Sequence, residues 1–156
     1  MKQTKLFFLF TAICFFGFNP NLRAQAIGDY GSAASGNWGD YSTTWVVCVT
    51  DGTWDGATAA TALPTTTTNV WIRNGHTVTI AVTGATCNNL TVMNGGTGVT
   101  TSGFLATTTG SVFTLQANST WKQAGGSSGL PGTTKNFDNT STVEFNGTQS
   151  SLSTFT

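Results

Sequence analysis

The chain has 156 residues, of which 8% are charged and 12% aromatic, and its formal net charge is zero. Six basic residues in the whole chain argue against a nucleic-acid-binding surface, because neutralising phosphates requires clustered Lys and Arg. The many aromatic and β-branched residues argue against intrinsic disorder, since disordered segments are rich in charge and poor in these residue types.

The first 26 residues have the organisation of a secretory signal peptide. Lys2 and Lys5 precede an apolar run at 6–18, and Ala24-Gln25-Ala26 has the small-x-small form of a cleavage site. The run is shorter than the roughly 20 apolar residues of a membrane-spanning helix. We therefore expect residues 1–26 to be removed and the mature chain, which has no membrane span, to be secreted, either extracellular or at the cell surface.

Residues 27–69 combine turn residues with large aromatic side chains. The stretch "SGNWGDYSTTW" (35–45) contains two tryptophans, and "DGTWDG" (51–56) contains a third. A Thr-rich stretch follows in which Pro64 argues against a continuous helix. We expect residues 27–69 to form an N-terminal cap followed by an extended loop.

Residues 70–156 contain short segments in which apolar and polar residues alternate with period two, the pattern of half-buried strands. These segments are "NVWIRNGHTVTI" (69–80), "NNLTVMN" (88–94), "SVFTLQANSTWKQ" (111–123) and "STVEFNG" (141–147). Within the first, Asn74-Gly75 predicts on local evidence a tight β-hairpin. No window of the mature chain carries a helical period over ten or more residues.

The spacing of the segments predicts the fold class. Successive segments begin roughly 20 to 30 residues apart, which is typical of a β-solenoid whose coils stack on one another. The alternative is an antiparallel β-sandwich, but sandwich strands recur about every 8 to 12 residues. We therefore predict an all-β solenoid over 70–156. Because stacked strands that simply stop would expose a sheet edge, we also expect the sequence to be the N-terminal piece of a longer protein.

Two cysteines, Cys48 and Cys87, remain after loss of the one in the leader. In an oxidising compartment such a pair predicts a disulfide, and the alternative is two buried free thiols.

The aromatic residues of the front segment have two interpretations. Trp38, Trp45, Trp54, Tyr30 and Tyr41 could form a platform that stacks on sugar rings of an extracellular polysaccharide. Alternatively, large rings cover the apolar interior of the first coil, which has no coil above it. The cap interpretation is favoured for Trp38 and Trp45. Trp54, in a turn-rich loop, is expected to be the most exposed of the three tryptophans.

The ionisable residues are too few to predict a catalytic or metal site. His76 has no carboxylate or cysteine near it in sequence, and Glu144 is the only glutamate. Asp51 and Asp55 share one loop, but two carboxylates do not make a calcium loop, so a polar turn is expected. We predict no catalytic residues, no metal, no cofactor and no enzyme activity. Asparagines are expected to form hydrogen-bonded ladders between coils: Asn88, Asn89, Asn94 and Asn146.

Taken together, "SGNWGDYSTTW", Pro64, "NVWIRNGHTVTI", "CNNLTV" and "STVEFNGTQS" resemble the N-terminal region of large secreted surface proteins of Bacteroidota-type bacteria. The front half is also similar to the eight-glycine β-strand domain of some large animal ectoproteins. The resemblance covers about residues 30–150. It implies a right-handed parallel β-helix closed by the Trp-rich segment, and export by the Sec route, often followed by the type IX system. It brings no catalytic residues.

The sequence thus predicts a secreted, non-enzymatic β-solenoid segment of a larger cell-surface or adhesin-like protein. Its partners would be an extracellular polysaccharide or a host or matrix surface. The alternative function is a carbohydrate-binding module, or an accessory domain of a carbohydrate-active enzyme, with Trp54, Trp38, Trp45 and Tyr41 as ligand-binding residues.

Overall fold

The structure, a computed structural model, describes residues 24–101, 105–124 and 129–146. Apart from residues 24–26, the predicted signal peptide lies outside this part of the chain, as do residues 147–156 of the predicted coil region. The fold is nearly all β, with 41% strand and 3% helix, and forms a β-solenoid of about three turns. This confirms the predicted parallel β-helix and not the alternative antiparallel sandwich.

Fourteen strands and one short helix make up the described part of the chain. They are β1 (Tyr30–Ser32), β2 (Gly36–Asn37), α1 (Tyr41–Thr44), β3 (Trp45–Val47), β4 (Thr58–Ala59), β5 (Val70–Ile72), β6 (Thr77–Ile80), β7 (Thr86–Cys87), β8 (Leu90–Val92), β9 (Thr97–Thr100), β10 (Ala106–Thr107), β11 (Val112–Leu115), β12 (Thr120–Ala124), β13 (Thr134–Phe137) and β14 (Thr142–Asn146).

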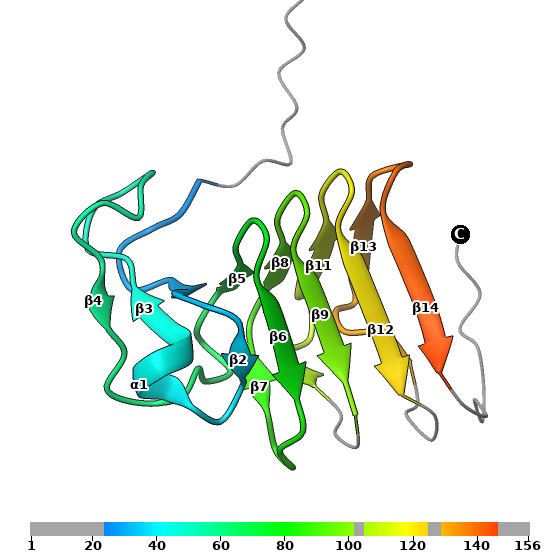
Figure 1. Cartoon of the computed structure of the whole chain (residues 1–156), viewed down its shortest axis with the longest axis horizontal. Coiled ribbons are helices and arrows are strands. Elements are labelled where there is room, and N and C mark those ends of the chain that lie inside the picture. The colour runs from blue at the N-terminus through cyan, green and yellow to red at the C-terminus, as the bar shows by residue number, and fades with distance from the viewer. Residues whose placement is uncertain (1–23, 102–104, 125–128, 147–156) are drawn as a thin grey trace, which may run out of the picture.

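The strands form three sheets that run along the solenoid (Figure 1). One sheet has the order β13-β11-β8-β5-β1-β3-β4, the second has the order β14-β12-β9-β6-β2, and β10 and β7 form a small third sheet. We call the first two sheet A and sheet B. Each coil contributes one strand to sheet A and the next strand in the chain to sheet B.

The pairing register defines the length of a coil. Leu90 is aligned with Val70 on one side and with Phe113 on the other, so the coils repeat after 20 and then 23 residues. All pairs between these coils are parallel and in register, so that inward-facing residues stack on inward-facing residues. The repeat falls within the predicted interval of 20 to 30 residues.

The predicted hairpin at Asn74-Gly75 is wrong. β5 lies in sheet A and β6 in sheet B, so the turn bends the chain from one sheet to the other and does not pair the two strands. A type I′ hairpin turn requires positive φ at both central residues, and here only Gly75 has it, at 73°. The same corner recurs in the following coils, where positive φ falls at Gly95 and Asn118.

The interior of the solenoid is filled by the inward-facing residues of the strands. They include Val70, Ile72, Val78, Ile80, Leu90, Val92, Phe113, Leu115 and Trp121, all at most 1% exposed. Phe113 and Trp121, from neighbouring strands of different sheets, meet edge to face with ring centroids 5.0 Å apart. The buried residues of successive coils belong to one hydrophobic cluster, so the core is continuous from coil to coil.

The N-terminal end of the solenoid is closed by a reversal of the chain. β1 and β2 pair in parallel with β5 and β6, so the ladder already begins within the segment predicted as the cap. The chain then forms α1 and returns as β3, which pairs antiparallel with β1, and β4 adds antiparallel to β3. Figure 1 shows α1 and the β3–β4 pair together at this end of the molecule.

Candidate functional site: the aromatic cap and the Trp54 loop

Trp38 and Trp45 lie at the centre of the cap, and neither indole has any exposed surface. Their rings meet edge to face, with centroids 5.0 Å apart and planes at 74°. The Trp45 Nε1–H donates a hydrogen bond to the Trp38 carbonyl oxygen over 2.9 Å. Rings with no exposed surface offer nothing on which a sugar can stack, so these two side chains serve as a lid over the first coil.

The glycine of the "SGNW" stretch allows α1 to lie close to β2. A Cβ atom at Gly36 would overlap the side chain of Thr44, which is itself buried. The short helix therefore rests directly on the backbone of β2, and this contact places Trp45, the next residue, over the end of the core.

Trp54 lies against the outside of the solenoid. A Cβ atom at Gly31 would be only 2.7 Å from two carbons of the Trp54 ring, so the ring rests on bare backbone. The guanidinium of Arg73 lies over the ring, 5.6 Å from its centroid, in a cation–π contact. Trp54 is half-buried, which makes it more exposed than Trp38 or Trp45, as the sequence predicted.

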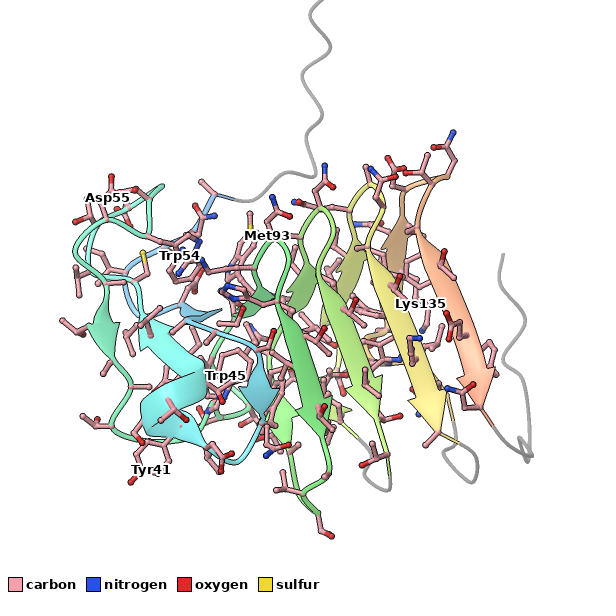
Figure 2. All side chains as sticks on the ribbon, in the orientation of Figure 1. Tyr41, Trp45, Trp54, Asp55, Met93 and Lys135 are labelled. Atoms are coloured by element: carbon pink, nitrogen blue, oxygen red, sulfur yellow. The ribbon has the colours of Figure 1, made fainter. Side chains whose placement is uncertain are left out.

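Tyr41 is 41% exposed and stands at the start of α1. Figure 2 shows Tyr41 and Trp54 at opposite edges of the cap, with Trp45 between them. The four side chains named as possible ligand-binding residues therefore do not form one continuous aromatic platform. Only Trp54 and Tyr41 have surface available to a ligand, and they are separate.

A ladder of polar side chains crosses the first coils. The carboxylate of Asp29, which is 6% exposed, accepts hydrogen bonds from Asn69 Nδ2 at 2.9 Å and from Trp71 Nε1 at 3.1 Å. The ladder continues because Asn69 Oδ1 accepts from Asn88 Nδ2 and, at 2.8 Å, from Asn89 Nδ2. Three coils are thus joined by side-chain hydrogen bonds.

The predicted asparagine ladder is confirmed for Asn88 and Asn89. Asn94, at the corner after β8, and Asn146, the last residue of β14, are in contrast exposed. Sequence reasoning missed Asp29 and Asn69, which are the other half of the ladder. Their bond spans 40 positions of the chain, and only the alignment of β1 with β5 brings them together.

His76 is half-buried and links the corner between β5 and β6 to β1. Its Nδ1 atom lies 2.9 Å from Ser32 Oγ, and that hydroxyl also accepts the Arg73 backbone N–H at 2.8 Å. Ser32 is completely buried. The Ser–His pair therefore fastens a turn to the neighbouring strand, and its hydroxyl is out of reach of a substrate.

The acidic residues of the Trp54 loop, Asp51 and Asp55, are exposed. Asp51 Oδ1 accepts the backbone N–H of Ile27 at 3.0 Å, and Asp55 donates its own backbone N–H to Thr53 Oγ1. Glu144 forms an ion pair with Lys122 on the neighbouring strand, 3.1 Å between Nζ and Oε2. Within the described residues, no three side chains among His, Cys, Asp and Glu come together as metal ligands.

The predicted disulfide between Cys48 and Cys87 is wrong, because both residues are buried free thiols. The Cys48 thiol lies 3.1 Å from the carbonyl oxygen of Thr50 and 3.2 Å from that of Thr53, so it is held by its own loop. Cys87 belongs to β7, inside the coils. Desolvation by burial raises the pKa of the Cys87 thiol to about 12.

No helix in the described residues is long and apolar enough to span a membrane. Comparison of the chain with protein-family models, with curated proteins and with solved structures gives no match.

Proposed function

We propose that this chain is a secreted, non-enzymatic β-solenoid segment of a larger cell-surface or adhesin-like protein, in which the coils act as spacing units. The observation that carries the proposal is the buried pair Trp38 and Trp45, which closes one end of a stack of in-register coils. These two tryptophans thereby act as a lid on a rod. The resemblance to secreted surface proteins of Bacteroidota-type bacteria supports the same role.

Parallel, in-register stacking supports a spacing role because each coil contacts only its neighbours. In such an array the stability is approximately a sum of coil and interface terms, and coils can be added without disturbing distant ones. The ladder from β6 through β9 and β12 to β14 keeps Thr77, Thr97, Thr120 and Thr142 aligned over four successive strands. A spacer requires such a regular repeat along its length, whereas a single binding pocket does not require one.

Duplication of one whole coil tests the spacing role. Because Leu90 and Phe113 are aligned, residues 90–112 are one repeat, and a second copy inserted after Val112 restores the register. We expect a folded protein that unfolds cooperatively and is longer by about 5 Å, one strand spacing, in small-angle scattering. A duplication of residues 90–101 alone, inserted after Thr101, is the matched control, since it adds β8 and β9 without the return segment that carries β10 and should prevent folding. If the whole-coil duplication also unfolds, the coils are not independent spacers.

A second candidate function, carbohydrate binding, is favoured by one observation. Of the five tryptophans in the chain, Trp54 alone keeps a partly exposed ring, and a cation lies beside it. Aromatic rings next to a basic side chain suit sugars that carry acidic groups. Affinity electrophoresis in gels containing neutral and acidic polysaccharides tests this function. Retardation that Trp54→Ala abolishes and Tyr41→Ala retains would support it, whereas no retardation in any gel would eliminate it.

A further inference from the structure

The predicted signal-peptide cleavage site lies beside two carboxylates. The small-x-small sequence at 24–26 predicts cleavage of the Ala26–Ile27 peptide bond. The backbone N–H of Ile27 donates a hydrogen bond to Asp51 Oδ1 at 3.0 Å. The backbone N–H of Ala26, one residue earlier, donates to Asp29 Oδ2, also at 3.0 Å. The nitrogen atom that cleavage would release therefore lies against one acidic group and close to another.

These carboxylates have neutral partners where a cation would be expected. Asp29 is 6% exposed, and buried carboxylates in proteins are usually paired with a positive charge. Its hydrogen bonds come from a backbone N–H, an asparagine amide and an indole N–H. In the part of the chain that the structure describes, the single ion pair is that of Lys122 with Glu144. The surroundings of the Ile27 nitrogen are thus suited to a positive charge.

Hydrolysis of the Ala26–Ile27 bond would place such a charge there. Water adds a hydroxyl group to the Ala26 carbonyl carbon and a hydrogen to the Ile27 nitrogen, and the released α-amino group is mostly protonated at neutral pH. An α-ammonium group then replaces the N–H that Asp51 accepts in the uncleaved chain.

The residues after the cleavage site are held in place independently of the leader. Gly28 N donates to the Cys48 carbonyl oxygen at 2.9 Å, and Cys48 N donates to the Asp29 carbonyl oxygen at 2.8 Å. Neither bond involves residues 1–26. The new N-terminus should therefore stay next to Asp51 when these residues have been removed.

Residues 51–56 form the Trp54 loop, and cleavage removes one of its anchors. In the uncleaved chain the Gly52 backbone N–H donates to the Gln25 carbonyl oxygen at 2.8 Å. We propose that the α-ammonium group of Ile27 supplies a replacement, an ion pair with Asp51 that fastens the Trp54 loop to the N-terminus of the mature chain. This ion pair would form whether the coils act as spacers or bind a carbohydrate.

The mass of the secreted protein tests the position of the cleavage. The full chain, expressed with its own leader in a bacterium and recovered outside the cytoplasm, should begin at Ile27. Any other first residue would overturn the proposal, because no ammonium group would then be formed at the Ile27 nitrogen.

Titration of the α-amino group tests the ion pair itself. Competitive acetylation of the mature chain at a series of pH values, followed by mass spectrometry, gives the pKa of this group. An unperturbed α-amino group has a pKa of about 7.7 to 8.0, and a carboxylate within hydrogen-bond distance should raise that of Ile27 by about one pH unit. The charged groups beside this terminus are Asp51 and Asp29. The Cys48 thiol instead contacts carbonyl oxygens of its own loop.

Two substitutions in the same loop separate the ion pair from a general loss of negative charge. Asp51→Asn keeps the shape of the side chain and should return the pKa of the Ile27 α-amino group towards its ordinary range. Asp55→Asn removes the same charge and should leave this pKa unchanged, since Asp55 is exposed and lies at the outer edge of the loop (Figure 2). In a chain that begins at Ala24, the α-amino group should titrate in the ordinary range with or without Asp51→Asn.

Hydrogen exchange measures whether the ion pair fastens the loop. The Thr53 and Ala57 backbone N–H groups donate to carbonyl oxygens of the Trp54 loop and its flank. In the mature chain they should exchange severalfold faster in Asp51→Asn than in the wild type or in Asp55→Asn. The proposal is overturned if folded Asp51→Asn keeps the wild-type pKa at Ile27, or if Asp55→Asn lowers that pKa equally. Equal exchange of these amides in all three proteins would also overturn it.

Discussion

The indole ring of Trp121 lies directly over the backbone of Gly98 on the preceding coil. The two residues are aligned in sheet B, and a Cβ atom at Gly98 would collide with the six-membered part of the ring. The two residues are complementary in size, because the Trp121 ring fills the space that a side chain at Gly98 would occupy.

Gly98→Ala is therefore expected to destabilise the protein by about 1 to 3 kcal/mol, the usual cost of overpacking a core. Urea unfolding followed by circular dichroism measures this loss. In a Trp121→Phe background the same substitution should cost clearly less, since the smaller ring leaves room for a methyl group. Equal costs in both backgrounds would show that the ring does not lie over Gly98.

Asn89→Ala should be costly because this side chain serves two neighbouring coils. Its Nδ2 donates to Asn69 Oδ1, and its Oδ1 accepts the Val112 backbone N–H at 2.7 Å. Loss of both leaves polar groups without partners, and we expect about 2 to 3 kcal/mol of destabilisation in urea unfolding. Asn94→Ala, at an exposed corner, is the control and should change stability by no more than about 0.5 kcal/mol. Equal effects of the two substitutions would contradict the ladder.

The two buried indoles of the cap should respond differently to replacement by phenylalanine. Trp45→Phe removes the Nε1–H group that donates a hydrogen bond to the Trp38 carbonyl oxygen. This buried oxygen then loses its partner. The Trp38 Nε1 atom, by contrast, is buried and has no hydrogen-bond partner among the described residues, so Trp38→Phe loses packing alone. We expect Trp45→Phe to cost about 1 to 3 kcal/mol more than Trp38→Phe in the free energy of unfolding. The opposite order would show that the hydrogen bond is not formed.

The buried thiol of Cys87 predicts a specific pH dependence. Burial raises its pKa from the ordinary 9.0 to about 12, so above pH 9 the unfolded chain loses a proton that the folded chain keeps. The free energy of unfolding should therefore fall as the pH rises from 9 to 12, by at most about 1.4 kcal/mol per pH unit from this group. The slope of stability against pH should be shallower in Cys87→Ala.

Thiol labelling gives an independent check on both cysteines. Native protein at pH 8 should react slowly with a thiol reagent at Cys48 and Cys87, and denatured protein should react at both without prior reduction. A denatured protein that reacts only after reduction would show a disulfide instead of two thiols.

The sequence was sufficient to predict the parallel solenoid, because its evidence is spread along the chain. Alternation such as that of Val78 and Ile80 marks the strands, and their wide spacing distinguishes stacked coils from a sandwich. The prediction of a hairpin was wrong because Asn74-Gly75 favours a turn whether or not the flanking strands pair with each other. Which sheet each strand joins depends on the next coil, and a local motif does not contain that information.

The candidate site was predicted in part. The burial of Trp38 and Trp45 followed from the need to cover the first coil, but the support beneath Trp54 could not be inferred, because Gly31 and Arg73 meet it only through the fold. The prediction of a disulfide was wrong for a similar reason. Counting cysteines shows that Cys48 and Cys87 can pair, whereas pairing requires that the fold bring the two sulfur atoms together.

Tryptophan fluorescence with acrylamide quenching, repeated in the presence of a panel of polysaccharides, tests the central claim most directly. A scaffold closed by a buried aromatic lid predicts that most of the emission is blue and resists quenching, that the small quenchable fraction disappears in Trp54→Phe, and that no polysaccharide changes either fraction. A polysaccharide that protects the quenchable fraction in the wild type, and has no effect in Trp54→Phe, would contradict a purely structural role and establish a carbohydrate-binding surface at Trp54.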